Sequence, residues 1–466
     1  MYTLSSKLRN LALAFMVIGL GGLVLGFLNA PKTIAEAKAM TATAHHGDDH
    51  GAGHESTPLH DTSEDKHHDE TSMSHQQQTE QGHANHETAD DTHGEHHDAS
   101  HDEHLLHQLQ NRPWAALYVA AFFFFMIALG VLAFYAIQRA AQAGWSPVLY
   151  RVMEAITAYL LPGGLIVISI LVLSGLHYNH LFIWMDPEVV AHDKLIAGKV
   201  GFLNVPFFLG RAVFFLAGWT FYRFISRKYS LAQDEATDNS NHVKNFRWSA
   251  GFLVFYIVTE SIMSWDWIMS IDPHWFSTLF GWYVFASMFV TGITVIALVT
   301  IYLKSKGYLD FVNDSHIHDL GKFMFGVSIF WTYLWFSQFM LIWYSNIPEE
   351  VTYFITRIED YNLPFFGMIA MNFLFPLLIL MNSDYKRTNY FIIMAGIVIV
   401  LGHYMDVFNM IMPSAVGDQW FIGMPEIGGF LFFLGLFLLI VFTALTKAPL
   451  LAKGDPYIGE SKRFHY

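Results

Sequence analysis

The sequence of 466 residues contains no cysteine. Cysteine side chains attach c-type haem, ligate most iron–sulfur clusters and form disulfides, so we expect none of these features in the chain. Only His403 lies well inside a long apolar run, whereas a b-type haem in a membrane needs facing histidines. We therefore expect no cofactor held by this chain, and any electron transfer must run through an organic carrier such as quinol or through other proteins.

Charged residues are also scarce, at 14% of the chain, whereas apolar residues make up 53%. This composition is typical of a protein that crosses a membrane several times. A spanning helix needs about 20 apolar residues. We therefore predict an all-α integral membrane protein with ten transmembrane helices, of which the first is a retained anchor. The runs lie at approximately 9–29, 114–138, 156–176, 201–224, 247–270, 279–303, 321–344, 364–382, 389–411 and 425–447.

Basic residues concentrate in alternate loops. The loops on the side of the N-terminus carry most of them, among them Arg139, Arg223, Arg227, Lys304 and Lys386, and the opposite loops carry few. An excess of Lys and Arg stays on the cytoplasmic side during membrane insertion. With ten spans, we expect both termini in the cytoplasm.

A histidine-rich segment, roughly 40–107, separates the first two spans and holds sixteen of the 25 histidines among many Asp, Glu, Ser and Thr. So few apolar side chains cannot offset the entropy lost on ordering. We therefore predict a disordered tether outside the membrane. Imidazoles and carboxylates would bind Zn, Cu or Ni loosely, but no ligand spacing recurs, so a structural metal site is not expected.

An internal repeat is indicated by equal spacings, since Asp266 precedes Pro273 as Asp406 precedes Pro413. The two pairs lie in the fifth and ninth spans, and a shift of four helices preserves orientation. We therefore predict two parallel four-helix bundles with one further helix at each end. The chain then divides into an anchor at 1–30, the tether at 31–110, bundles at 111–275 and 276–415, and a last helix with a cytoplasmic tail at 416–466.

Titratable side chains inside apolar runs are candidates for a proton relay, because an isolated charge is very unfavourable within a membrane. The fifth run contains Glu260 and Asp266, and the fourth contains Arg211. We expect Glu260 to pair with Arg211, although that ion pair is equally consistent with a purely structural role. The spacing of His403 and Asp406 places both on one face of the ninth helix.

Hydroxyl side chains add to this polar set. Ser287, Thr291 and Thr294 share one face of the sixth run. Hydroxyls on spanning helices most often bond to their own backbone, which is the alternative interpretation. Together with His403 and Asp406, however, they predict a hydrogen-bonded water chain inside the second bundle. A buried Na⁺ site would use the same groups, so these residues do not distinguish a proton path from a Na⁺ site.

Four long motifs carry a resemblance to a known family. They read SWDWIMSIDPHWFSTLFGWYVFASMF, FWTYLWFSQFMLIWYSNIPEE, MNFLFPLLILMNSDYKRTNYF and GHYMDVFNMIMP. In these motifs the chain resembles the F subunit of alternative complex III, the bacterial quinol:cytochrome c oxidoreductase. That family is similar in turn to polysulfide-reductase-type (NrfD-like) membrane subunits. The resemblance covers nearly all of the chain from about 110 to 450, and the histidine-rich tether has no counterpart in the family pattern.

The resemblance implies a membrane complex in the bacterial inner membrane, with the tether in the periplasm. The implied partners are multihaem and monohaem cytochrome c subunits, an iron–sulfur subunit and a homologous ten-helix subunit that oxidises quinol. A supercomplex with a terminal oxidase is a further possible assembly. The haem c and iron–sulfur clusters would lie in those partners. The F-type subunit would provide a proton path and scaffold, and it is often described as quinone-binding.

Two other functions remain open. A proton- or cation-coupled secondary transporter would also contain membrane carboxylates and a repeat, although Pro162 and Pro206 have no clear counterparts in the other half. A non-catalytic membrane scaffold would use the same polar groups only to lock helices together. The sequence shows no phosphate-binding loop, nucleophile triad or nucleic-acid-binding pattern, so an independent soluble enzyme is not expected.

Overall fold

The computed structural model describes residues 2–45 and 91–465. All regular structure among these residues is helical, and ten helices are long and apolar enough to cross a membrane. The predicted fold class, an all-α multi-pass membrane protein, is confirmed. The spans are α1 (Ser6–Leu28), α3 (Asp91–Ala140, apolar from Leu105), the Pro147–Gly175 helix, α8 (Val205–Gln233), α9 (Ser240–Trp267), α10 (Phe280–Ser305), α11 (Asp314–Ser345), the Asn362–Leu380 helix, α15 (Asn389–Val416) and α16 (Met424–Leu445).

Two of the spans are interrupted. The third consists of α4 (Tyr150–Ile156) and α5 (Leu160–Gly175), which a short 3-10 turn separates. The eighth consists of α13 (Asn362–Ile369) and α14 (Phe375–Leu380), which a π-helical turn separates. Five short helices complete the described part: α2 (Ile34–His45), α6 (Pro187–His192), α7 (Lys194–Ala197), α12 (Pro348–Glu359) and α17 (Ile458–Arg463).

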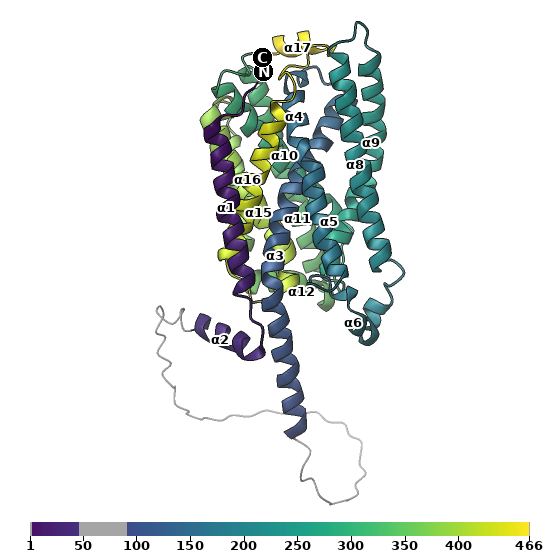
Figure 1. Cartoon of the computed structure of the whole chain (residues 1–466), viewed down its shortest axis with the longest axis vertical. Helices are drawn as coiled ribbons and strands as arrows, with labels where there is room; N and C mark the ends of the chain where they lie inside the picture. The colour runs from purple at the N-terminus through teal and green to yellow at the C-terminus, as the bar shows by residue number, and fades with distance from the viewer. Residues whose placement is uncertain (1, 46–90, 466) are drawn as a thin grey trace, which may run out of the picture. The chain divides into compact units, whose positions relative to one another are not determined.

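The chain divides into two compact units, 1–30 with 108–466, and 31–107. The first unit is a bundle of long helices, and α1 begins at the end of this bundle where α17 lies (Figure 1). We call this the terminal end. The short helices α6 and α12 lie at the opposite end (Figure 1).

The second unit contains α2 and the first turns of α3. Both are helical where composition predicted a disordered tether. The alanine-rich sequence of α2 has a high intrinsic helix propensity, which the count of polar residues does not reflect. The rest of the predicted tether, 46–90, with most of its histidines, lies outside the described residues.

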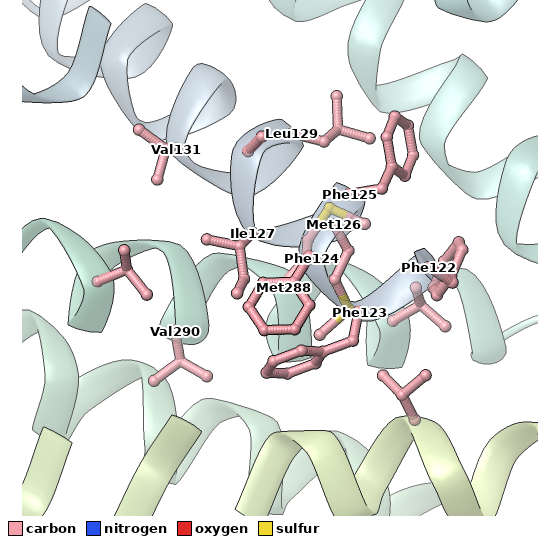
Figure 2. Close-up of a cluster of buried hydrophobic side chains, with 14 of the residues drawn as sticks. Phe122, Phe123, Phe124, Phe125, Met126, Ile127, Leu129, Val131, Met288 and Val290 are labelled. Carbon is pink, nitrogen blue, oxygen red and sulfur yellow. The ribbon is translucent and has the colours of Figure 1, made fainter. Parts of the chain in front are cut away.

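The centre of the bundle is a close crossing of α3 and α10. Gly130 and Gly292 allow the two backbones to approach, because an added Cβ would lie 2.2 Å from the Met288 oxygen and 2.9 Å from the Val131 nitrogen, respectively. Apolar side chains of α3 pack around this crossing with Met288 and Val290 (Figure 2). By the predicted repeat, α3 and α10 are the first helices of the two bundles.

The other long helices pack in two groups around this crossing. The helix α8 packs against α5 and α9, and α15 packs against α10 and α13. The remaining pair, α1 and α16, packs side by side through small residues, because a Cβ on Gly19 would lie 2.3 Å from the Phe432 nitrogen. The helices α3 to α9 are called the first bundle below, and α10 to α15 the second.

Candidate functional site

A polar cluster centred on Asp406 is enclosed by α10, α11 and α15. Asp406 is fully buried, and its carboxylate accepts hydrogen bonds from the Tyr283 hydroxyl, from Ser287 Oγ at 2.8 Å and from Trp331 Nε1 at 2.9 Å. Within the described chain no Lys or Arg forms an ion pair with it. The neutral donors satisfy the carboxylate lone pairs, so the charged form has partners even without a cation.

His403 completes the cluster from one turn earlier on α15. Its Nδ1 lies 3.3 Å from Asp406 Oδ2 and 3.0 Å from Ser287 Oγ, and its ring is fully buried. The edge of the imidazole meets the Trp331 ring, with centroids 5.2 Å apart. The predicted shared face of His403 and Asp406 is thus observed, and a proton has a direct route between Nδ1 and Oδ2.

The helix next to His403 departs from regular geometry. Pro376 has no N–H to donate to the carbonyl of Asn372, and the chain forms a π-helical turn at Ala370–Leu374. Gly402 lets this turn approach α15, because a Cβ there would lie 2.1 Å from Asn372 Oδ1. The fully buried Asn372 amide has no hydrogen-bond partner in the described structure, and it lies against Gly402, which precedes His403 in the chain.

The hydroxyl side chains divide between the two predicted roles. Ser287 joins the Asp406 cluster, whereas Thr291 donates to the Ser287 carbonyl at 2.6 Å and Thr294 to the Val290 carbonyl at 2.7 Å. Bonding to the helix backbone is therefore the observed role of the two threonines. Ser328 is buried with its hydroxyl unpaired among the described residues.

A small cavity of about 10 Å³ adjoins Tyr283 on the side toward α12. Arg357 and Asn409 line it, and both are buried, at 3% and 2% exposure. Arg357 donates to the carbonyls of Asn409 at 3.0 Å and Tyr353 at 2.8 Å, but its Nη2 and Asn409 Oδ1 find no partner in the described chain. This volume and these polar atoms suit one water molecule.

Arg211 and Asp266 form an ion pair, which corrects the predicted pairing of Arg211 with Glu260. Arg211 Nε and Nη2 lie 2.6 and 2.8 Å from the two oxygens of Asp266. Arg211 on α8 could reach either Glu260 or Asp266 on the neighbouring helix α9. The two carboxylates are six residues apart, however, so they point in directions about 120° apart around α9. Arg211 is near the middle of the predicted fourth run, 201–224, whereas in the structure it lies close to the start of α8 at Val205.

Glu260 is a buried carboxyl group apart from the ion pair and the Asp406 cluster. It is 2% exposed, and its Oε1 has no hydrogen-bond partner among the described residues. The Ser261 hydroxyl lies 3.5 Å from its Oε2. The side chain lines a pocket between α9 and α10, away from both Arg211 and the Asp406 cluster.

A larger cleft of about 510 Å³ lies beyond the end of α9. Its walls are mostly apolar, and three polar residues, Lys199, Ser270 and Asp272, line it. Lys199 Nζ donates to the Pro273 carbonyl at 2.5 Å. Burial lowers the pKa of Lys199, which lies outside the spans.

A buried ionic cluster at the terminal end was not found from the sequence. Arg139 donates to Asp455 at 3.0 Å, and Arg151 donates to Glu154 at 2.7 Å and Asp234 at 2.5 Å. In the sequence, Arg139 served only as a loop charge that indicates orientation. Arg139 lies at the end of α3 and Arg151 and Glu154 lie on α4, whereas Asp455 belongs to the C-terminal segment.

Sequence reasoning also missed Tyr283, Trp331 and Arg357. An available signal was that a buried Trp or Tyr in an apolar helix needs a partner for its N–H or O–H. The partners of Tyr283 and Trp331 depend on the relative register of α10, α11 and α15.

No protein-family model and no curated protein matches the chain.

Proposed function

We propose that the chain is an integral subunit of a membrane-bound quinol:cytochrome c oxidoreductase, and that its second bundle transfers protons. The observation that carries the proposal is the enclosed cluster of Asp406, His403, Ser287, Tyr283 and Trp331. A relay needs adjoining groups that exchange a proton without leaving either one unsatisfied. The ten helices and the resemblance of the motifs to alternative complex III support the assignment to an oxidoreductase complex.

The proposed path enters from the opposite end of the bundle. A water in the cavity beside Arg357 and Asn409 would contact the Tyr283 hydroxyl, which donates to Asp406. From Asp406 the proton passes to His403 Nδ1, directly or through Ser287 Oγ. The Arg357 guanidinium lies near the proposed entrance, where a positive charge would discourage other cations from following the proton.

The quinol, which would be oxidised mainly at the homologous ten-helix subunit, would supply electrons and protons. The cleft beyond α9 suits its head group, because the walls are apolar and aromatic while Lys199 and Asp272 offer a donor and an acceptor. The electrons would pass to haem c and iron–sulfur clusters in partner subunits, since this chain has no cysteine with which to attach them.

The proposed assembly follows from the resemblance to alternative complex III. The chain would reside in a bacterial inner membrane, with both termini in the cytoplasm and the tether in the periplasm. Its partners would be multihaem and monohaem cytochromes, an iron–sulfur subunit and a homologous ten-helix subunit that oxidises quinol. A terminal oxidase would complete a supercomplex.

Affinity purification of the full chain in mild detergent tests the assembly. Haem-containing subunits should copurify, and the preparation should reduce cytochrome c with quinol. A chain recovered alone and colourless, from cells whose quinol oxidation survives its deletion, would contradict the proposal. Uptake of a substrate by that isolated chain in proteoliposomes would then indicate a transporter.

A further inference from the structure

The pocket at Glu260 is separate from the proposed proton path. It has a volume of about 140 Å³ and lies between α9 and α10, with Ile137 of α3 at its inner wall. Tyr256, Trp282 and Phe285 provide aromatic walls. An apolar cavity of roughly 150 Å³ accommodates a benzene ring, so this pocket has the size of one ring.

The mouth of the pocket is on the outside of the bundle. Ile257 and Trp282 line it and are 52% and 48% exposed, whereas Glu260 at its base is 2% exposed. Both helices lie within candidate membrane spans. A ligand therefore enters sideways, from the apolar phase of the membrane.

The base of the pocket provides one strong hydrogen-bonding group. Glu260 Oε1 is buried and unpaired in the described structure, and the Ser261 hydroxyl already donates to the Ile257 carbonyl at 3.1 Å. Tyr256 directs its hydroxyl to Met288 Sδ at 3.1 Å. A lone carboxylate among such walls is very unfavourable, so Glu260 is expected as the neutral acid, which both donates and accepts.

We propose that this pocket binds the ring of a lipid-soluble molecule that carries a carbonyl or phenolic oxygen, with Glu260 as the group that recognises that oxygen. The aromatic walls fit a flat ring, and the acid fits one oxygen at its edge. A water molecule alone would bind poorly in this pocket, because a buried water needs two to four polar partners. A phospholipid head group is also unsuited, because no basic side chain lines this pocket.

A quinone head group has this chemistry, and in that case the pocket would serve the pool used by the proposed complex. The binding itself does not depend on haem partners or on Asp406. Its test therefore uses the purified full chain and no measurement of electron transfer, so that failure here leaves the proposed function untouched.

Labelling with dicyclohexylcarbodiimide, an apolar reagent specific for protonated carboxyl groups, provides the test. The acid proton moves to a carbodiimide nitrogen, the carboxyl oxygen bonds to the central carbon, and the acyl group then migrates to nitrogen with no atom lost. Mass spectrometry of peptides should find the adduct on Glu260. The adduct should be absent in Glu260→Gln.

Competition identifies the ligand chemistry. Decylubiquinone should reduce labelling of Glu260 by about fivefold more than decylbenzene or decanol, the factor that one hydrogen bond contributes to binding. Equal protection by all three compounds would mean that the pocket holds only an alkyl chain, and it would overturn the proposal. Protection by decylbenzene together with decylubiquinone, but not by decanol, would remove the role of the oxygen and would also overturn it.

Ile257→Trp provides a second variant, which keeps the acid and fills the mouth. Labelling of Glu260 should fall at least as far in this variant as with decylubiquinone. Unchanged labelling would show that the reagent reaches Glu260 by another route, and the lateral pocket would be refuted even if Glu260→Gln fails to fold.

Discussion

The two bundles contain carboxylates at similar places in their sequences but hold them in opposite surroundings. In the first bundle, Phe125, Trp219 and Trp267 fill the interior with packed rings. Asp266, one of the carboxylates of this bundle, forms an ion pair with Arg211. In the second bundle a polar cluster is enclosed among buried apolar side chains, and Asp406 is at its centre.

The difference shows that a carboxylate in a spanning helix does not define a proton site by itself. Asp266 and Asp406 each precede a proline by seven residues. One is held by a charged partner, and the other by neutral donors and an imidazole, the arrangement on which the proposed proton transfer rests. The surrounding helices decide the role, and they differ between the two halves.

Asp406→Asn gives the largest expected effect. The amide cannot carry a proton to or from His403, so proton-coupled turnover of the complex should fall by about 100-fold or more, the usual range for loss of a proton-transferring group. Quinol oxidation by purified complex is the measurement. The matched control is Asp266→Asn in the first bundle, whose assembled complex should keep most of its turnover. Equal losses in both variants would erase the distinction between the bundles.

Asp266→Asn should instead lower stability. Arg211 is only 11% exposed and would lose its charged partner, so the loss is expected at about 2 kcal/mol, below the range for a fully enclosed pair. Thermal unfolding in detergent measures it. The double variant Arg211→Met with Asp266→Leu should recover most of the stability; if it does not, the pair has a role beyond mutual compensation.

Gly130→Ala tests the contact between the bundles. The added methyl group would meet the Met288 backbone oxygen, so we expect a loss of about 1–3 kcal/mol in unfolding free energy. Gly251→Ala on α9 is the control, because its Cβ would meet no atom within 4 Å. A silent Gly130→Ala would mean that the bundles are not in close contact at this crossing.

The smallest effect is expected from pH at the terminal end of the first bundle. Burial opposes ionisation of Asp455, but the His242 ring at 3.6 Å and the Arg139 guanidinium at 3.0 Å outweigh it and lower the pKa of Asp455. Its contribution to stability is therefore complete above the ordinary Asp pKa, about 3.9, and is lost as the pH falls through the lowered value.

Limited proteolysis of the C-terminal segment at decreasing pH measures this contribution. Cleavage should increase at acid pH in the natural chain, and Asp455→Asn should already be sensitive at neutral pH. An acid sensitivity that is the same in both proteins would assign it to another group.

The sequence was sufficient for the spans, since each needs only a long apolar run, and all ten occur in the structure. It also placed His403 beside Asp406, because residues three apart on a helix share a face. The sequence did not predict which side chains on different helices would be partners. The pairing of Asp406 with Tyr283 and Trp331 depends on helix register and rotation. The error over Arg211 arose because the apolar run did not locate the start of α8, on which the depth of Arg211 depends.

Infrared difference spectroscopy of the purified complex, recorded on reduction with quinol, tests most directly whether Asp406 changes its protonation. The account predicts a carboxyl C=O band that shifts in heavy water, disappears in Asp406→Asn and persists in Asp266→Asn. A band that survives Asp406→Asn unchanged, or no carboxyl band at all, would contradict it.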